Sequence, residues 1–213
     1  DHPNPCRLVE KFKEYSRDVF LPLKDLPRLM DLLEREPNLY VRSALLLFLL
    51  TGMRKTELLT AKWDWVDFDR RELRLPDTKG GRPHYVPLTE PAFAILQNLP
   101  RMENNPYIFP SLTDPGKRLW NIDKPWRRIR AEAGLDHIHI HDLRRSVGSW
   151  MAESGVSLQI IGKVLNHADI NTTKICSRLT EEPARAALDQ VSEKVVDLTR
   201  LGVVKTHADT KIE

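Results

Sequence analysis

The sequence has few cysteines, no long hydrophobic run and no tyrosine after Tyr107. Its 2 cysteines, Cys6 and Cys176, lie far apart in unlike surroundings, which is not the pattern of a disulfide framework and fits a reducing compartment. The longest apolar run, residues 44–50, is far shorter than the ~20 residues that span a bilayer, and we read no signal peptide at the start. We therefore expect a cytoplasmic protein that does not contact a membrane.

A strong net charge is also missing. The chain has 213 residues, of which 41% are apolar and 30% charged, and a net charge of only +3, so total charge decides little about its partners. Basic residues are nevertheless clustered, either as solvated faces or as surfaces that bind phosphate. The first cluster is Lys117, Arg118, Lys124, Arg127, Arg128 and Arg130, and the second is Arg70, Arg71, Arg74, Lys79 and Arg82.

The apolar periodicity predicts a mainly helical protein with a small three-stranded antiparallel sheet, an α+β fold. Residues 1–20 lack periodicity and are predicted to be a linker. Strands are expected over residues 63–68, 72–75 and 83–88, and glycine or asparagine at positions 52, 134, 155 and 166 is expected to end helices. Helices are expected over residues 23–36, 40–50, 55–61, 90–98, 123–133, 141–153, 157–165, 171–179 and 183–198.

Two arginines lie at predicted helix ends, where the backbone would hold them rigidly. Arg54 comes just after the glycine that ends a buried helix, and Arg144 lies in the first turn of a later helix. Planar guanidinium groups stay charged at any working pH and match the non-bridging oxygens of a phosphate under in-line attack. The alternative is structural: Arg54 would pair with Glu57, and Arg144 with Asp142 or Glu153.

Two histidines and a lysine complete a candidate phosphate site. His141 precedes Arg144 by three residues, so both would project from one face of a helix start, where free amides favour an anion. Lys79, in a glycine-containing hairpin, could protonate a departing 5′-oxygen, and His167 could donate a hydrogen bond to the phosphate. Taken singly, each has a structural alternative as a helix cap or a solvated lysine. Their joint occurrence favours phosphate chemistry, with Glu57 orienting Arg54 or His141.

A metal site is the rival interpretation of one segment. His137, His139, His141 and Asp142 resemble a His-x-His-x-His string on a strand. We reject it because the spacing turns helical directly after His141 and no further ligand set recurs downstream.

These motifs resemble the catalytic domain of a phage-type integrase of the tyrosine recombinase family. The resemblance rests on TGMRKTEL at residues 51–58, the hairpin lysine ahead of VPL at 86–88, HDLRR at 141–145, LNH at 165–167 and TT at 172–173, and covers residues 21–180. It implies the breaking-rejoining catalytic fold of that family and an activating set of Arg54, Lys79, His141, Arg144 and His167. It also implies a linker at 1–20, a catalytic domain at 21–182 and a C-terminal helix and tail at 183–213 that contacts another protomer.

The implied function is site-specific DNA recombination by a prophage or genomic-island enzyme in a bacterial cell or phage-infected host. A tyrosine attacks the phosphate, leaves a 3′-phosphotyrosine and a free 5′-hydroxyl, and the strand is rejoined to a partner, with no metal or other cofactor. The expected partner is double-stranded DNA, bound by a homotetramer, with the free protein monomeric. Candidate DNA-binding residues are Arg82, Lys117, Arg118, Lys124, Arg127, Arg128 and Arg145.

Cys176 departs from the family pattern, because it stands where the nucleophilic tyrosine is expected. A thiolate beside arginines and a histidine is a good nucleophile, but its sulfur lies one bond beyond Cβ, whereas a phenolic oxygen lies across a ring. We therefore expect DNA binding with very poor cleavage, whether the cysteine is a deliberate substitution or the mark of a degenerate copy. A working cysteine nucleophile, a type IB topoisomerase-like enzyme and a non-catalytic DNA-binding relative are the alternatives.

Overall fold

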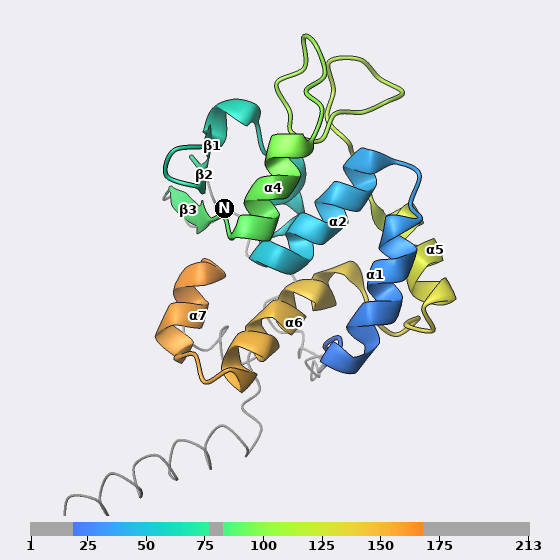
Figure 1. Cartoon of the computed structure of the whole chain (residues 1–213), viewed down its shortest axis with the longest axis vertical. Coiled ribbons are helices and arrows are strands. Elements are labelled where there is room, and N and C mark those ends of the chain that lie inside the picture. The colour runs from blue at the N-terminus through green and yellow to red at the C-terminus, as the bar shows by residue number, and fades with distance from the viewer. Residues whose placement is uncertain (1–18, 77–82, 168–213) are drawn as a thin grey trace, which may run out of the picture.

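The computed structural model describes residues 19–76 and 83–167. Its helices are α1 Leu26–Glu34, α2 Leu39–Thr51, α3 Lys55–Thr60, α4 Glu90–Asn98, α5 Asp123–Glu132, α6 Ile140–Glu153 and α7 Leu158–Val164, and its strands are β1 Val66–Asp67, β2 Glu72–Leu75 and β3 His84–Pro87 (Figure 1). The mainly helical fold with one three-stranded antiparallel sheet confirms the prediction. None of the helices in these two ranges has the length and apolar character of a transmembrane span.

Several predicted features lie outside the described residues. They are residues 1–18 of the linker predicted at 1–20, the helices at 171–179 and 183–198, and the side chains of Lys79, Arg82 and Cys176.

Helix α2 forms the centre of the fold. Asn38 caps its start, because the side chain accepts hydrogen bonds from the amides of Tyr40 at 3.0 Å and Val41 at 3.2 Å. Apolar residues cover nearly its whole circumference, and α1, α3, α4 and α6 pack around it (Figure 1). The helix ends at Gly52, whose left-handed φ of 62° confirms the predicted glycine stop.

The sheet has β2 between β1 and β3, with Leu73 opposite Val66 on one side and Val86 on the other. The strand predicted over residues 63–68 is wrong in its first half. Trp63–Trp65 forms a 3-10 helix, in which the Trp65 amide donates to the Lys62 carbonyl at 3.1 Å. Burial of Trp63 in the core outweighs the strand preference of an aromatic residue.

The first predicted helix also begins differently. Residues 23–25 form a 3-10 turn, and α1 begins with Pro27 in its first turn, where the missing proline N–H costs no hydrogen bond. Ahead of it, Leu21 is fully buried against α6. Its amide donates to Ser146 Oγ at 2.7 Å, and its carbonyl accepts from Trp150 Nε1 at 3.0 Å. Residue 21 is thereby fastened to α6.

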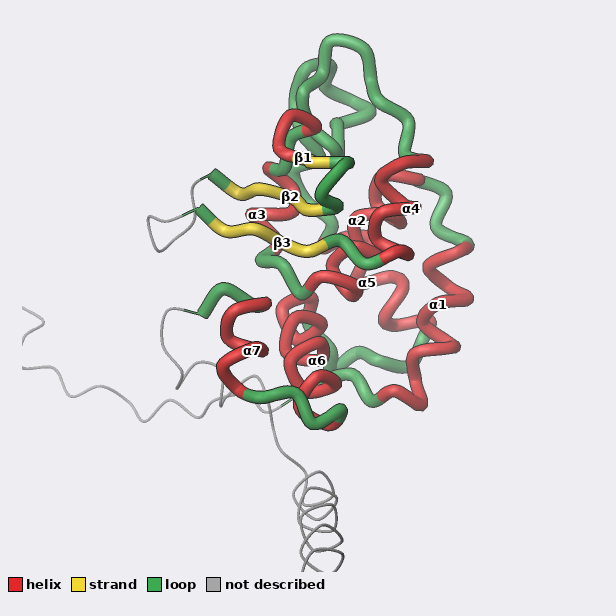
Figure 2. Tube along the Cα trace, turned by 60° about the vertical axis from the view of Figure 1, so that its left-hand side comes forward, coloured by secondary structure: helices red, strands yellow, loops and turns green. Residues whose placement is uncertain are grey.

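Helices α6 and α7 lie next to each other at one end of the fold (Figures 1 and 2). Helix α6 begins at Ile140, because the His139 amide donates to Asp142 Oδ2 at 2.8 Å and closes the first turn. Helix α7 packs on α6, and its C-terminal end lies next to β3 (Figures 1 and 2). Asn166 follows α7 with a left-handed φ of 50° and turns the chain away, as its predicted role as a helix end requires.

Candidate active site

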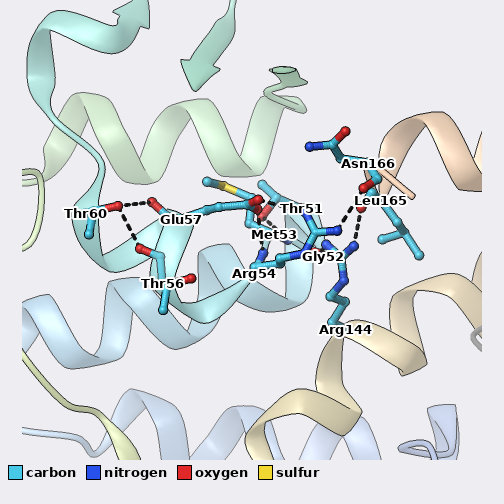
Figure 3. A network of polar contacts seen from close by, with 10 residues as sticks. All are labelled: Thr51, Gly52, Met53, Arg54, Thr56, Glu57, Thr60, Arg144, Leu165 and Asn166. Carbon is cyan, nitrogen blue, oxygen red and sulfur yellow. Dashed lines mark hydrogen bonds and ion pairs between the residues drawn. The ribbon is translucent and has the colours of Figure 1, made fainter. Parts of the chain in front are cut away.

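Two arginines from different helices meet at one turn after α7. Arg54 Nη2 donates to the Asn166 carbonyl at 2.9 Å, and Arg144 Nη2 donates to the carbonyl of Leu165 (Figure 3). Because these carbonyls belong to consecutive residues, the two guanidinium groups lie side by side. The structure therefore brings together two arginines that are 90 positions apart in the sequence.

Arg54 is held by its own helix start. It is the residue before α3, and its amide donates to Glu57 Oε2 at 3.0 Å. Its Nη1 donates to Glu57 Oε1 at 2.8 Å. The Arg54–Glu57 pair of the structural alternative is therefore present. It leaves Nη2 of the guanidinium able to donate to the Asn166 carbonyl. Glu57 orients Arg54, one of the two roles predicted for it.

Arg144 is the more deeply buried of the two, with 3% of the residue exposed. Its Nη1 donates to the Gly52 carbonyl at 2.5 Å, so its guanidinium joins the end of α2 to the end of α7. Gly52 is needed at this junction for space as well as for its φ, since a Cβ there would lie 2.6 Å from Leu165 Cδ2. Burial of a charge is costly unless it is hydrogen-bonded, which explains why Arg144 contacts carbonyls at both helix ends.

Both predicted histidines lie in the field of these arginines. Burial lowers the pKa of His141, and Arg144 and Arg145 lower it further. Burial also lowers the pKa of His167, with further contributions from Arg144, Arg54 and His141, to about 4. Both imidazoles are therefore neutral at neutral pH. His141 lies in the first turn of α6 and does not cap it, since the cap residue is His139.

A histidine that sequence reasoning missed lies in the same field. The backbone of Val164 and the charges of Glu57, Arg144 and Arg54 all act on the pKa of His84, a residue of β3. Burial is the largest cause of its lowered pKa. The available signal was its place in the alternation of residues 83–88, where an inward position carries an imidazole in place of an apolar side chain.

The resulting cluster has the chemistry of an anion site. Two permanently charged guanidiniums adjoin imidazoles that are neutral and able to donate a hydrogen bond. A phosphate placed there would offset the positive charge that depresses the histidine pKa values. Lys79 and Cys176, the other two members of the predicted site, lie outside the described residues.

The histidines of the rejected metal interpretation lie around the start of a helix and not on a strand. His139 precedes α6 and His141 lies within it, so the alternating histidines do not share one face of a strand. Across residues 19–76 and 83–167, no three His, Cys, Asp or Glu side chains are grouped closely enough to hold a metal ion.

The basic residues of α5 divide by position. Lys124 and Arg127 are exposed on its outer side. Arg128 instead forms an ion pair with Glu36, a residue that is 5% exposed, and so fastens α5 to the connection between α1 and α2. Of the three predicted DNA contacts on this helix, Arg128 thus has a structural partner.

The other predicted DNA contacts lie on the loop before α5 and on α6. Lys117 pairs with Asp114 at 2.7 Å, and the Arg118 guanidinium lies 4.5 Å from the ring centre of Trp120, which is 76% exposed. Arg145 lies 3.4 Å from an oxygen of Asp142. The remaining predicted contact, Arg82, lies outside the described residues.

A sequence profile of the phage integrase family matches residues 19–182 of this chain. The chain belongs to the phage integrase family. Two curated relatives of this integrase domain are tyrosine recombinase XerA of Pyrococcus furiosus, 29% identical over 168 residues, and the shufflon-specific DNA recombinase of Escherichia coli, 33% identical over 174 residues. The matched segments cover 76% and 80% of this chain but 58% and 43% of those proteins, so it spans about half of their length.

Solved structures of tyrosine recombinases share the fold of the integrase domain. A crystal structure of XerA recombinase aligns with a TM-score of 0.67 at 23% identity, covering 85% of this chain and 66% of that one. A lambda integrase dimer bound to a COC′ core site aligns with a TM-score of 0.65 at 18% identity, covering 80% of this chain and 51% of that one. The helical fold with its small sheet is therefore that of tyrosine recombinase catalytic domains.

Proposed function

We propose that this chain is the catalytic part of a site-specific DNA recombinase of the tyrosine type, and that its substrate is a phosphodiester of double-stranded DNA in the cytoplasm. The supporting observation is the meeting of Arg54 and Arg144 at the consecutive carbonyls of Leu165 and Asn166. In this proposal, residues 1–20 are a linker, 21–182 the catalytic domain and 183–213 a segment that contacts a neighbouring protomer.

The proposed roles follow from the chemistry of each group. Arg54 and Arg144 would bind the non-bridging phosphate oxygens, whose charge grows in the transition state. His141 and His167 would donate hydrogen bonds to the same phosphate, and Lys79 would protonate the departing 5′-oxygen. The bond energy would be kept in a covalent protein–DNA intermediate, so the reaction would need neither a metal nor a nucleotide.

Cys176 decides how active this chain is. Its sulfur reaches much less far than a tyrosine oxygen, and a misplacement of about 1 Å at a reacting atom can cost about a hundredfold in rate. We propose that the chain binds DNA but cleaves it very poorly.

Reversion of this residue tests the proposal. The chain and its Cys176→Tyr variant would be incubated with a pool of nicked suicide duplexes of randomised sequence, and covalent adducts would be separated on a denaturing gel. We expect an adduct only with Cys176→Tyr, and no adduct when Arg144→Gln is added to it. Failure of Cys176→Tyr to form any adduct would overturn the catalytic proposal.

Cys176 itself favours a second candidate, a non-catalytic DNA-binding relative. A Cys176→Tyr variant that binds duplex DNA but forms no covalent adduct with it would favour this candidate over the recombinase. A topoisomerase-like activity would relax supercoiled DNA without exchanging strands between two marked duplexes.

Light scattering tests the expected oligomeric states, because we expect a monomer without DNA and a tetramer on paired recombination sites.

A further inference from the structure

His84 occupies an unusual position on the sheet. It lies opposite Leu75 in the pairing of β2 with β3, on the face that carries the buried side chains of Leu73 and Val86. Its neighbour Tyr85 projects to the other side and is 50% exposed. The alternation therefore directs an imidazole inward at a position where the other inward residues are apolar.

The imidazole is directed at the end of α7. The backbone of Val164, the last residue of that helix, acts on the pKa of the imidazole and so lies beside it. Backbone carbonyls at a helix C-terminus lack partners within the helix, so an imidazole N–H is a suitable donor for one of them. Such a bond would join the sheet to a helix about 80 positions further along the chain.

Three consecutive residues thus each lie against a different element. Leu165 accepts a hydrogen bond from Arg144 of α6 and Asn166 one from Arg54 at the start of α3, and Val164 lies beside His84 of β3. The next residue is His167. The two arginines bind the turn and are also the groups proposed to bind phosphate, so the place of the turn and the place of the phosphate are coupled.

We propose that His84 donates a hydrogen bond to the Val164 carbonyl and is thereby a positioning residue of the phosphate pocket, the third anchor of the turn at residues 164–166, which sets where His167 lies relative to Arg54 and Arg144. This inference rests on the proposed function. A histidine that only packs in the core would affect folding stability but not the order of this turn in the folded protein. A positioning residue affects the turn and the chemical step and leaves DNA affinity almost unchanged.

The test compares His84→Ala with two variants that can still donate to the Val164 carbonyl, His84→Gln and His84→Asn. All are made in the Cys176→Tyr protein, and Tyr85→Ala is the matched control because it alters the same strand on its opposite face. Three quantities are measured: amide hydrogen exchange at residues 165–167, the dissociation constant for DNA, and the single-turnover rate of adduct formation. The amides at 165–167 donate to carbonyls at residues 161–163, so their exchange reports whether the turn stays closed.

We expect His84→Ala to speed exchange at residues 165–167 and to slow adduct formation by about tenfold to a hundredfold, as a misplaced pocket should. DNA affinity should change by less than about twofold, since phosphate contacts elsewhere supply most of it. At least one of His84→Gln and His84→Asn should restore both exchange and rate, and Tyr85→Ala should match the parent.

Unchanged exchange in His84→Ala would overturn the inference, and so would faster exchange with an unchanged rate of adduct formation. Loss of rate in all three variants without rescue would show a need for the imidazole itself and would also overturn a positioning role. If the Cys176→Tyr parent forms no adduct, the proposed function fails and the role of His84 fails with it. If the parent is active and the His84 variants match it in exchange and in rate, the role of His84 is rejected and the proposed function is not.

Discussion

Helices α2 and α6 pack against one another but bury different proportions of polar side chain. The buried residues of α2 are mostly apolar, with Phe48 fully enclosed near its end. Half of the buried residues of α6 are polar or charged, namely Asp142, Arg144, Ser146 and Ser149, each with at most 3% of the residue exposed. Two neighbouring helices of similar length thus meet the interior in different ways.

The difference separates the part that stabilises the fold from the part that places charge. Apolar burial is non-directional and scales with the area removed from water, so α2 stabilises the fold without needing specific polar partners. Buried polar groups need specific partners, which fix their positions. Arg144 is held at the carbonyls of Gly52 and Leu165, and Ser146 lies between the Asp142 carbonyl and the Leu21 amide. Specific hydrogen bonds therefore fix the position of the buried polar groups of α6.

The largest expected effect is on the α2 side. Phe48→Ala removes a fully buried ring and should lower the free energy of unfolding by about 3–5 kcal/mol. Chemical denaturation followed by circular dichroism measures this loss. Leu50→Ala is the control on the same helix, since Leu50 is 37% exposed and its truncation should cost much less. Equal losses for the two variants would contradict a core centred on α2.

A comparable effect, but on chemistry, is expected on the α6 side. Arg144→Gln in the Cys176→Tyr protein should slow adduct formation by about a hundredfold to a thousandfold, the range for loss of one preorganised donor to a developing charge. Single-turnover cleavage of a selected duplex measures the rate. Arg35→Gln is the control, because Arg35 is exposed at the end of α1, away from the pocket. A rate that survives Arg144→Gln would remove this arginine from the proposed site.

A smaller effect is expected where α6 fastens residue 21. Ser146→Ala leaves the buried Leu21 amide without its acceptor and should cost about 1–3 kcal/mol of unfolding free energy. Ser154→Ala provides the comparison, since the exposed Ser154 hydroxyl donates only to the Trp150 carbonyl of its own helix. Urea titration of both variants distinguishes them. If the two losses match, the contact between Leu21 and α6 contributes little.

The smallest effect is a dependence of stability on pH. Because the pKa of His167 is lowered to about 4 from 6.5, the unfolded chain takes up a proton first as the pH falls. The stabilisation is therefore present above pH 6.5 and is lost progressively toward pH 4. We expect His167→Gln to reduce the slope of unfolding free energy between pH 7 and pH 5. An unchanged slope would mean that His167 titrates normally and lies outside the field of the arginines.

Local signals in the sequence predicted much of the fold. Residues 72–75 form a strand with the predicted bounds, and Gly52 and Asn166 end helices with left-handed backbones, a conformation that glycine and asparagine adopt more readily than other residues. The error at Trp63–Trp65 came from a local preference for strand that burial of the first tryptophan overrides.

The candidate site was predictable in part for the same reason. Its charged members could be named, because arginine and histidine carry recognisable chemistry in a recognisable order. Their present partners could not, because Arg144 binds carbonyls 92 and 21 positions away, and any residue type supplies a carbonyl. His84 was missed because the alternation of residues 83–88 marks its position as inward but does not say which element lies opposite it.

The central claim is that two guanidiniums and the nearby imidazoles form one anion pocket. The most direct measurement is an NMR titration of the His167 imidazole, with and without a bound DNA duplex, in this chain and in its Arg144→Gln variant. In the free chain we expect a pKa of about 4. DNA should raise it toward 6.5, because a phosphate offsets the arginine charge, and Arg144→Gln should raise it without DNA. A His167 pKa that responds neither to DNA nor to the loss of Arg144 would contradict a shared pocket.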